Sequence, residues 1–473
     1  MAGSIRKPIG SAMKPFSALR ENTVNKFVKL PVLALVLGAG VHAVHAETIE
    51  TKGGFKVKSD DGSFEASLGG RIQFDLYELN EDEGAFATAP DGRTAAFGSN
   101  TSSNDERGST YFRRLYLTLK GKAYGWNYKF EPDFAGNSTN NGVATGSSNN
   151  SRDIAFQDIY ISHALGPGEV FIGQIKPFRG MEELTSSNDI TMMERPFASA
   201  AGTYGGGSSR EFQEGLFYKA DIGDFLLGAG FFDLRRDNTR PTEGLGYNGR
   251  IVYSPLHASG QVVHLGLSYS DENPQTNGND GSDDNIGAAA AYAGRRGPSI
   301  LLGSTRDGDH ARTLGAELAG ELGPAQLQAE YMLQTVGQGD GAHDQDIPAW
   351  YVQASYLLTG ENRPYKKGEG TFGQPKPAGE HGAIELALRY DHAENKDSYA
   401  ACDVAIAAST GSSPLPASSV AATSCEASLI TAGVNWYVNP SVRFMLDYLK
   451  GENDRGFAKD KPEAVTARAQ FAF

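Results

Sequence analysis

The sequence predicts an all-β fold: a transmembrane antiparallel β-barrel of about 16 strands (18 possible), with long external loops and one loop folded into the pore. Three features predict it. The C-terminus is an amphipathic strand, the N-terminus carries a secretory signal, and segments of alternating apolar and polar residues are joined in turn by short turns and long polar loops. No stretch beyond the N-terminal region is apolar over the length of a transmembrane helix. Since only helices and closed barrels satisfy every backbone polar group in lipid, a membrane protein with this sequence has to be a barrel.

The closing strand is the clearest element. Residues 463–473 alternate between an apolar and a polar face, and the chain ends in an aromatic residue. The apolar face holds Val465, Ala467, Ala469, Phe471 and Phe473; the other holds Ala464, Thr466, Arg468, Gln470 and Ala472. We expect the apolar face to contact outer-membrane lipids, and this strand, ending at Phe473, to be bound by the barrel-assembly machinery.

Residues 1–46 have the pattern of a signal peptide. A basic region precedes an apolar run, Leu30–Val41, which is too short to span a bilayer, and Ala46 ends a small-residue cleavage site. Whether translation starts at Met1 or at Met13 is left open. We therefore predict export, cleavage and localisation in the cell outer membrane of a Gram-negative bacterium.

Charge and cysteine content exclude some functions. Residues 1–46 hold six of the 43 basic and one of the 57 acidic residues, which leaves a formal charge of −19 on the remainder. A protein this acidic does not bind nucleic acid through its overall field. Cys402 and Cys425 lie in one polar loop, and in an exported protein we expect them to form a disulfide. No metal-ligand spacing surrounds them, and the sequence predicts no cofactor.

The number of strands follows from the alternating segments and their connections. Alternation recurs within residues 64–77, 112–122, 126–131, 325–334, 384–391 and 442–448. Short turns and long loops alternate between such segments, as in outer-membrane barrels, where turns are periplasmic and loops external. Counting gives sixteen strands with both termini periplasmic, a short periplasmic segment at 47–62 and the barrel at 63–473. Residues 287–311 would make eighteen strands if they joined the barrel as a hairpin. A barrel of either size encloses a water-filled lumen.

Basic and acidic side chains share the predicted lumen face. The basic ones are Arg71, Arg114, Lys120, Lys122, Lys129, Arg250, Arg389, Arg443 and Arg468; the acids are Glu65, Asp75, Glu131, Glu317, Glu330, Glu385, Asp391 and Asp447. Two interpretations stay open. The charges form cross-strand ion pairs that keep a polar wall wet, or the Arg and Lys side chains form a strip that attracts an anion and passes it on.

The loop at about 178–210 is unusually apolar for an external loop. It contains Leu184, Ile190, Met192, Met193 and Phe197 among its polar residues. Because an exposed loop needs no such side chains, we expect this one to fold inward and narrow the pore.

Several segments resemble the phosphate-selective porin O and P family. The resemblance runs from about Phe64 to Phe473 and is most specific in Ile172–Phe178, Ser186–Arg195, Tyr356–Tyr365, Gly382–Tyr390 and Gly433–Asn439. It implies a sixteen-stranded barrel that assembles as a homotrimer and takes up inorganic anions, phosphate or a related one.

The resemblance also implies roles for individual residues. Arg113 and Arg114 look like paired arginines near the constriction, Asp158 like its lone acid, and Lys176 and Arg195 like its basic members. Further pore-lining candidates are Arg71, Lys120, Lys122 and Arg389, with the hydroxyls of Ser186, Ser187 and Thr191 as donors. Arg forms bidentate bonds to phosphate oxygens, whereas Lys acts as a mobile point charge. Asp158 either weakens the attraction so that the anion leaves, or orients Arg114.

Three other functions compete with an anion channel. The main alternative is a general diffusion porin whose charges are paired and which has little ion selectivity. A barrel enzyme needs a nucleophile beside a base; His163 and His264 lie on predicted strands, but no Ser–His spacing stands out, so we predict that the chain is not an enzyme. A passive structural or adhesive barrel would conduct negligibly.

Overall fold

The computed structural model describes residues 46–50, 55–80, 86–96, 106–135, 154–199, 212–234, 244–274, 286–292, 299–305, 310–337, 343–406, 408–409 and 415–473. Residues 46–473 form one compact unit. The predicted signal peptide, up to residue 45, and residues 200–210 of the predicted inward loop lie outside the described residues. None of the helices in the described part of the chain is long and apolar enough to cross a membrane.

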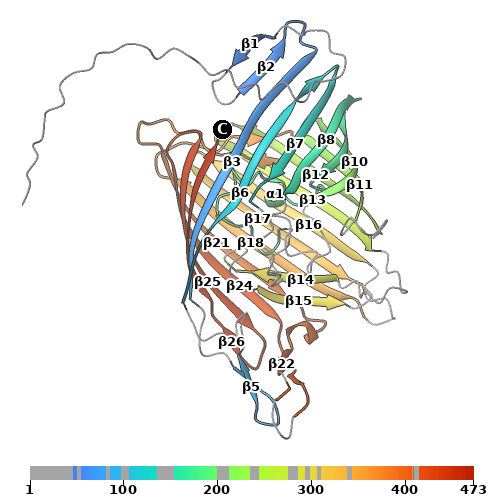
Figure 1. The fold of residues 1–473 in the computed structure, drawn as a ribbon, viewed down its shortest axis with the longest axis vertical. Helices are drawn as coiled ribbons and strands as arrows, with labels where there is room; N and C mark the ends of the chain where they lie inside the picture. Colours follow the sequence, from blue (N-terminus) through green and yellow to red (C-terminus); the bar gives the residue numbers. More distant parts are fainter. Residues whose placement is uncertain are drawn as a thin grey trace, which may run out of the picture. The chain divides into compact units, whose positions relative to one another are not determined.

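The described strands close into an antiparallel barrel of sixteen strands (Figure 1). They are β3 (Phe64–Asn80), β6 (Glu106–Ala123), β7 (Trp126–Asp133), β8 (Ala155–Leu165), β9 (Gly168–Ile175), β10 (Gln213–Ile222), β11 (Phe225–Asp233), β12 (Gly244–Ala258), β13 (Gln261–Pro274), β16 (Ala311–Leu322), β17 (Ala325–Val336), β18 (Gln345–Leu357), β21 (Ala383–Glu394), β24 (Glu426–Tyr437), β25 (Val442–Asp454) and β27 (Glu463–Ala472). Each pairs with the next, and β27 pairs with β3 from Glu463↔Asn80 to Ala472↔Arg71. The predicted fold is therefore confirmed.

The closing strand shows why alternation specifies a barrel wall. Phe471 is 44% exposed on the outer face of β27, whereas Arg468 is 1% exposed and points into the lumen. The last residue also joins the wall, because Phe473 and Gly70 exchange two backbone hydrogen bonds of 3.1 and 3.0 Å. A Cβ added to Gly70 would lie 2.5 Å from the Tyr116 carbonyl oxygen, so only glycine allows this closure.

Shorter elements sit at the barrel ends and inside it. At the end with the short turns, here called the turn end, β1 (Ala46–Glu50) pairs with β2 (Phe55–Ser59), which extends the sheet beside β3. The remaining short elements are β4 (Phe86–Thr88), β5 (Thr94–Ala96), α1 (Met181–Leu184), β14 (Ile286–Ala291), β15 (Ser299–Thr305), β19 (Tyr365–Lys366), β20 (Thr371–Phe372), η2 (Ala400–Cys402), β22 (Val404–Ile406), β23 (Ser418–Val420) and β26 (Lys459–Asp460).

Within the predicted 287–311 hairpin, β14 and β15 do pair with each other, but they form a separate two-stranded sheet. The eighteen-strand alternative is therefore wrong. The physical reason is that β13 pairs with β16 along twelve residue pairs, from Gln261↔Leu322 to Glu272↔Ala311. This pairing leaves the hairpin no strand edge to insert into.

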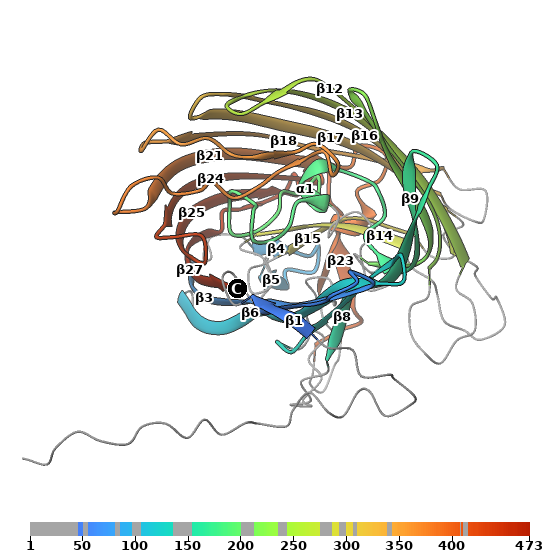
Figure 2. The same cartoon turned by 90° about the horizontal axis from the view of Figure 1, so that it is seen from above.

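Three segments fold into the lumen, and Figure 2 shows α1, β14 and β15 within the ring of strands. The first is residues 176–199 with α1, here called the constriction loop, which agrees with the predicted inward loop. The second is the 360–381 turn with β19–β20, where Phe372 packs with Met181 of α1. The third is hairpin β14–β15, which packs against the inner wall near the end with the long loops, here called the loop end. The sequence predicted only the first of these.

Candidate functional site

Wall arginines hold the backbone of the constriction loop. Arg443 donates to the carbonyls of Ile190 and Thr191 at 2.8 and 3.0 Å, and Arg468 donates to that of Met193 at 2.7 Å. Arg389 donates to the Glu194 carbonyl at 2.9 Å. Every one of these guanidinium groups therefore fixes the loop.

Glu194 pins the same loop through its side chain. Arg113 donates to both carboxylate oxygens at 2.7 and 3.0 Å, and Arg468, itself paired with Asp75, donates at 3.0 Å. Burial alone would raise the pKa of Glu194, but the two guanidinium groups lower it well below its ordinary value of 4.5. The loop is thus tied to β6 and β27 by an ion-pair network that persists into acid.

A β-bulge explains why Arg113 and Arg114 both point inward. Gln73 of β3 pairs with Arg114 and Phe74 pairs with Phe112, so that Arg113 is the extra residue in β6. Without the bulge, one of two consecutive residues would face lipid. The bulge allows Arg113 to bind the loop while Arg114 faces the space beneath it.

Hydrogen bonds and ion pairs join the 360–381 turn to the barrel wall and to the constriction loop. Arg363 forms a bidentate pair with Glu385 and donates to the Asp189 carbonyl at 3.0 Å, while Lys366 pairs with the Asp189 carboxylate at 2.6 Å. Arg250 pairs with Glu317 on the barrel wall. It also donates to the backbone carbonyls of residues 369 and 370 in the turn. The turn therefore forms a floor under the constriction loop.

Between loop, floor and wall lies a cavity of about 410 Å³. Nine basic and three acidic side chains line it. The basic ones are Arg71, Arg114, Lys120, Lys129, Lys176, Arg195, Lys219, Arg250 and Lys366; the acids are Glu131, Asp158 and Glu369. The cavity is thus strongly positive inside a chain whose net charge is −14. A basic lining in a low-dielectric wall concentrates anions.

These cations differ in how far they are neutralised. Lys129 pairs with Asp158 and Glu131, and Arg71 lies 3.6 Å from Glu131 while donating to the Ser187 hydroxyl at 2.7 Å. In contrast, no carboxylate of the described residues pairs with the three cations Arg114, Lys120 and Lys219. Arg114 donates to the Gln73 side chain at 2.9 Å, and Lys219 lies 5.7 Å from the centre of the Phe171 ring. Their charge remains available to a solute.

The structure brings eight of the predicted site residues to the cavity: Arg71, Arg114, Lys120, Asp158, Lys176, Ser186, Ser187 and Arg195. Lys176 donates to the Glu183 carbonyl at 2.7 Å, and Arg195 donates to three loop carbonyls, so both also shape the loop. Asp158 contacts Lys129 rather than Arg114, which disfavours the orienting role.

Four predicted residues do not line the cavity. Arg113 and Arg389 hold the loop, Thr191 is buried within it, and Lys122 is exposed near the turn end. Sequence reasoning placed Lys129 and Arg250 in the lumen without assigning them to the site, and it missed Lys219 and Lys366. For Lys219 the alternation of β10 was the available signal; Lys366 gave none, because a turn at the barrel end is not expected to fold inward.

A closed sixteen-strand barrel with an apolar outer face and an internal constriction over a charged cavity defines a porin-type channel of the outer membrane. The chain belongs to the phosphate-selective porin O and P family, which matches residues 91–473. It is 29% identical over 456 residues to Porin O of Pseudomonas aeruginosa, covering 90% of this chain and 92% of that one. An uncharacterised Caulobacter vibrioides protein is 24% identical over 382 residues, covering 74% and 65%.

Solved porin structures share the fold. An anion-selective porin from Comamonas acidovorans superimposes with a TM-score of 0.52 at 15% identity, covering 87% of this chain and 100% of that one. The outer membrane channel DcaP of Acinetobacter baumannii gives a TM-score of 0.50 at 12% identity, covering 88% and 99%. Porin O and the two solved structures are porins or channels by description.

Proposed function

We propose that the chain forms an anion-selective, phosphate-preferring diffusion channel in which the cavity cations attract the anion and pass it on. The observation that carries this proposal is the excess of basic over acidic side chains around the cavity, nine against three. The family's description as phosphate-selective supports the same solute. The relation to Porin O is consistent with it.

Each group has a distinct role in this proposal. Arg114 supplies a planar fork of donors that matches two phosphate oxygens, and the flexible Lys120 and Lys219 act as point charges on either side. Ser186 and Ser187, which the Arg71 guanidinium contacts, offer hydroxyl donors that replace water around the anion. The pairs that Asp158 and Glu131 form with Lys129 limit the attraction, which lets the anion leave.

The test is the reversal potential of the purified protein in a planar bilayer under a potassium chloride gradient, followed by phosphate titration. We expect a potential near the chloride limit and a chloride current that phosphate blocks. Replacing Arg114, Lys120 and Lys219 together by Ala should move the potential toward zero and abolish the block. A wild-type potential near zero without phosphate block would leave a general diffusion porin and overturn the proposal.

We infer a homotrimer from the family resemblance. Chemical cross-linking of the detergent-solubilised protein measures it: a ladder ending at three copies is expected, and a single band at one copy contradicts it.

A further inference from the structure

One side of the lumen is apolar near the loop end. Lumen-facing residues of β17, β18, β24 and β25 are mostly polar toward the turn end, as a water-filled barrel requires. Toward the loop end apolar residues join them, at Met332, Val336, Ile347, Leu429 and Leu449, all of them buried, although Gln334 and Gln345 on the same face are polar. Apolar lumen positions of this kind need a cover.

Hairpin β14–β15 is that cover. Ala288, Ala290, Tyr292, Ile300 and Leu302 turn to the wall and are all nearly inaccessible, whereas Ala289 and Ala291 alternate with them and are partly exposed. The Tyr292 ring packs edge-on against Phe197 of the constriction loop, with ring centres 5.3 Å apart. The Tyr292 hydroxyl donates to the Glu452 carbonyl at 3.0 Å. The hairpin therefore narrows the lumen directly above the constriction loop.

Among the described residues, β14 and β15 form backbone hydrogen-bond ladders only with each other and not with any barrel strand. An isolated two-stranded hairpin is marginally stable in water. Its position therefore depends on its side-chain contacts with the wall and on the elements that cover it.

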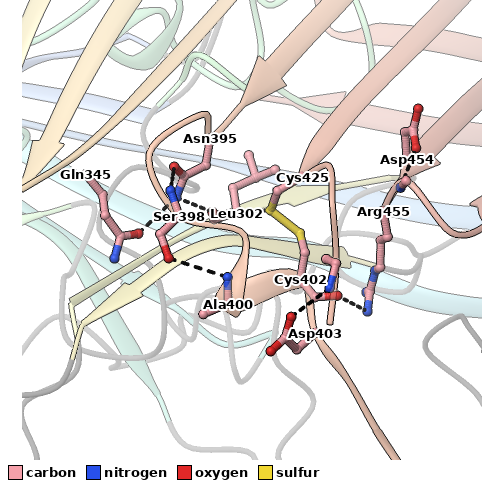
Figure 3. Close-up of a disulfide and its surroundings, with 12 residues drawn as sticks. Leu302, Gln345, Asn395, Ser398, Ala400, Cys402, Asp403, Cys425, Asp454 and Arg455 are labelled. Atoms are coloured by element: carbon pink, nitrogen blue, oxygen red, sulfur yellow. Dashed lines mark hydrogen bonds between the residues drawn. A yellow bond between two sulfur atoms is a disulfide. The ribbon is translucent and has the colours of Figure 1, made fainter. Parts of the chain in front are cut away.

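The Cys402–Cys425 disulfide lies beside Leu302 of β15 (Figure 3). Cys402, at the end of η2, is bonded to Cys425, just before β24, and η2 packs against β15. Asn395 donates from its side chain to the Leu302 carbonyl at 2.8 Å, and its backbone N–H donates to the Cys425 carbonyl at 2.9 Å. Both cysteines are buried, at 0% and 1% exposure. The disulfide thus ties η2, which contacts β15, to the start of β24 in the barrel wall.

We propose that the Cys402–Cys425 disulfide is a strap that positions hairpin β14–β15 against the lumen wall, and thereby sets the size limit for solutes on the loop side of the cavity. The bond joins Cys402 of η2 to Cys425 beside β24, 23 positions along the chain, and so removes conformations in which η2 moves away from the wall. Without it, η2 no longer confines β15 and the hairpin leaves the wall. The inference goes beyond ion preference and holds for any permeating solute.

The direct test uses single cysteines as reporters of hairpin position. Ala290→Cys places a thiol on the buried face of β14, and the matched control Ala289→Cys places one on the lumen face. Each is made with the disulfide intact and with Cys402→Ser/Cys425→Ser, and is reacted with a membrane-impermeant maleimide. We expect Cys at 290 to be protected with the strap and to react without it, while Cys at 289 reacts in both. Equal protection of position 290 in the two backgrounds would overturn the proposal.

Conductance gives the functional measurement. Cys402→Ser/Cys425→Ser should raise single-channel conductance and admit larger neutral sugars in liposome swelling, with phosphate block unchanged. The rise is limited to about twofold if the constriction loop remains as a comparable resistance in series. A joint change of conductance and phosphate block would indicate general loosening of the barrel and contradict a strap. Unchanged conductance and sugar limit would contradict it as well.

Should the double serine variant fail to insert, the hairpin itself is tested with the disulfide intact. Ala290→Asp puts a charge against the apolar wall and should release the hairpin and raise conductance. The Ala289→Asp side chain faces the lumen. This variant should not raise conductance, but it should lower the preference for anions. Equal conductance of the two Asp variants would overturn the inference. Failure of the proposed function can be told apart from failure of this inference, because it would show as a wild-type reversal potential near zero.

Discussion

Replacing Arg114 by Met should weaken phosphate block strongly while leaving the barrel at least as stable. Arg114 is 3% exposed and lines the cavity, and within the described part of the chain its guanidinium donates to the Gln73 side chain at 2.9 Å and pairs with no carboxylate. A buried guanidinium without a carboxylate costs desolvation free energy that an apolar side chain of similar length does not. The protein retains this cost, which is expected when the charge serves a solute.

The smallest expected loss is that of one charge-assisted hydrogen bond from the guanidinium to the bound anion. A hydrogen bond to a charged group contributes about 1.5–3 kcal/mol. Because about 1.4 kcal/mol corresponds to a tenfold change in an equilibrium constant, the blocking constant for phosphate should rise by about 10- to 100-fold. Arg114→Lys keeps the positive charge but loses the planar fork of donors. Its blocking constant should therefore lie between those of wild type and Arg114→Met.

The assay is phosphate titration of the chloride current in planar bilayers, with Arg312→Met as the matched control. Arg312 lies at the loop end of β16, with its side chain 48% exposed and paired with Asp271, and it does not line the cavity. Heat-modified electrophoretic mobility reports the stability of the same samples. A blocking constant for Arg114→Met within twofold of wild type would refute the reasoning, as would a large loss of stability.

Three further predictions concern the constriction loop. Glu194→Gln leaves Arg113 buried without its carboxylate, at a cost of about 3 kcal/mol, and should increase open-channel noise; a recording as quiet as wild type would contradict the pinning role. The pKa of Glu194 is lower than its ordinary value, so its stabilisation is fully present above about pH 4.5 and is lost only as pH falls through the lower folded-state value; wild-type noise should therefore not change between about pH 7 and pH 5. Gly228→Ala would place a Cβ 2.7 Å from the Phe178 ring, so the start of the loop must shift and conductance should change, whereas Gly223→Ala, with nothing within 4 Å, should leave conductance unaltered despite local backbone strain.

The sequence determined the wall because strand phase is a local property. In β27, apolar and polar residues alternate without a break, and the same pattern places Arg468 inside and Phe471 outside in the structure. Alternation of this kind depends only on the pleat of the strand. The family motif Ser186–Arg195 is also a contiguous segment. The inward position of the constriction loop could therefore be predicted from that segment and from the apolar residues within the loop.

Alternation failed where one local pattern fits two tertiary outcomes. Strands β14 and β15 form the pair that their pattern suggests, yet the pair covers the lumen wall instead of joining it. A signal was present in the lumen-facing Met332, Val336 and Leu449, since apolar residues at wet positions indicate a missing cover. Reading that signal required knowing which strands are neighbours.

What the sequence by itself determined is the barrel, its strand phase and most of the wall charges that face inward. What only the tertiary structure decided is how those charges divide. Arg468 and Arg114 have the same lumen phase, but Arg468 holds the constriction loop through Asp75 and Glu194, while Arg114 is left facing the cavity. The difference arises because the position of the constriction loop decides which arginine meets a carboxylate. Glu194 is 274 residues away from Arg468 in the chain, so no local pattern predicts their contact.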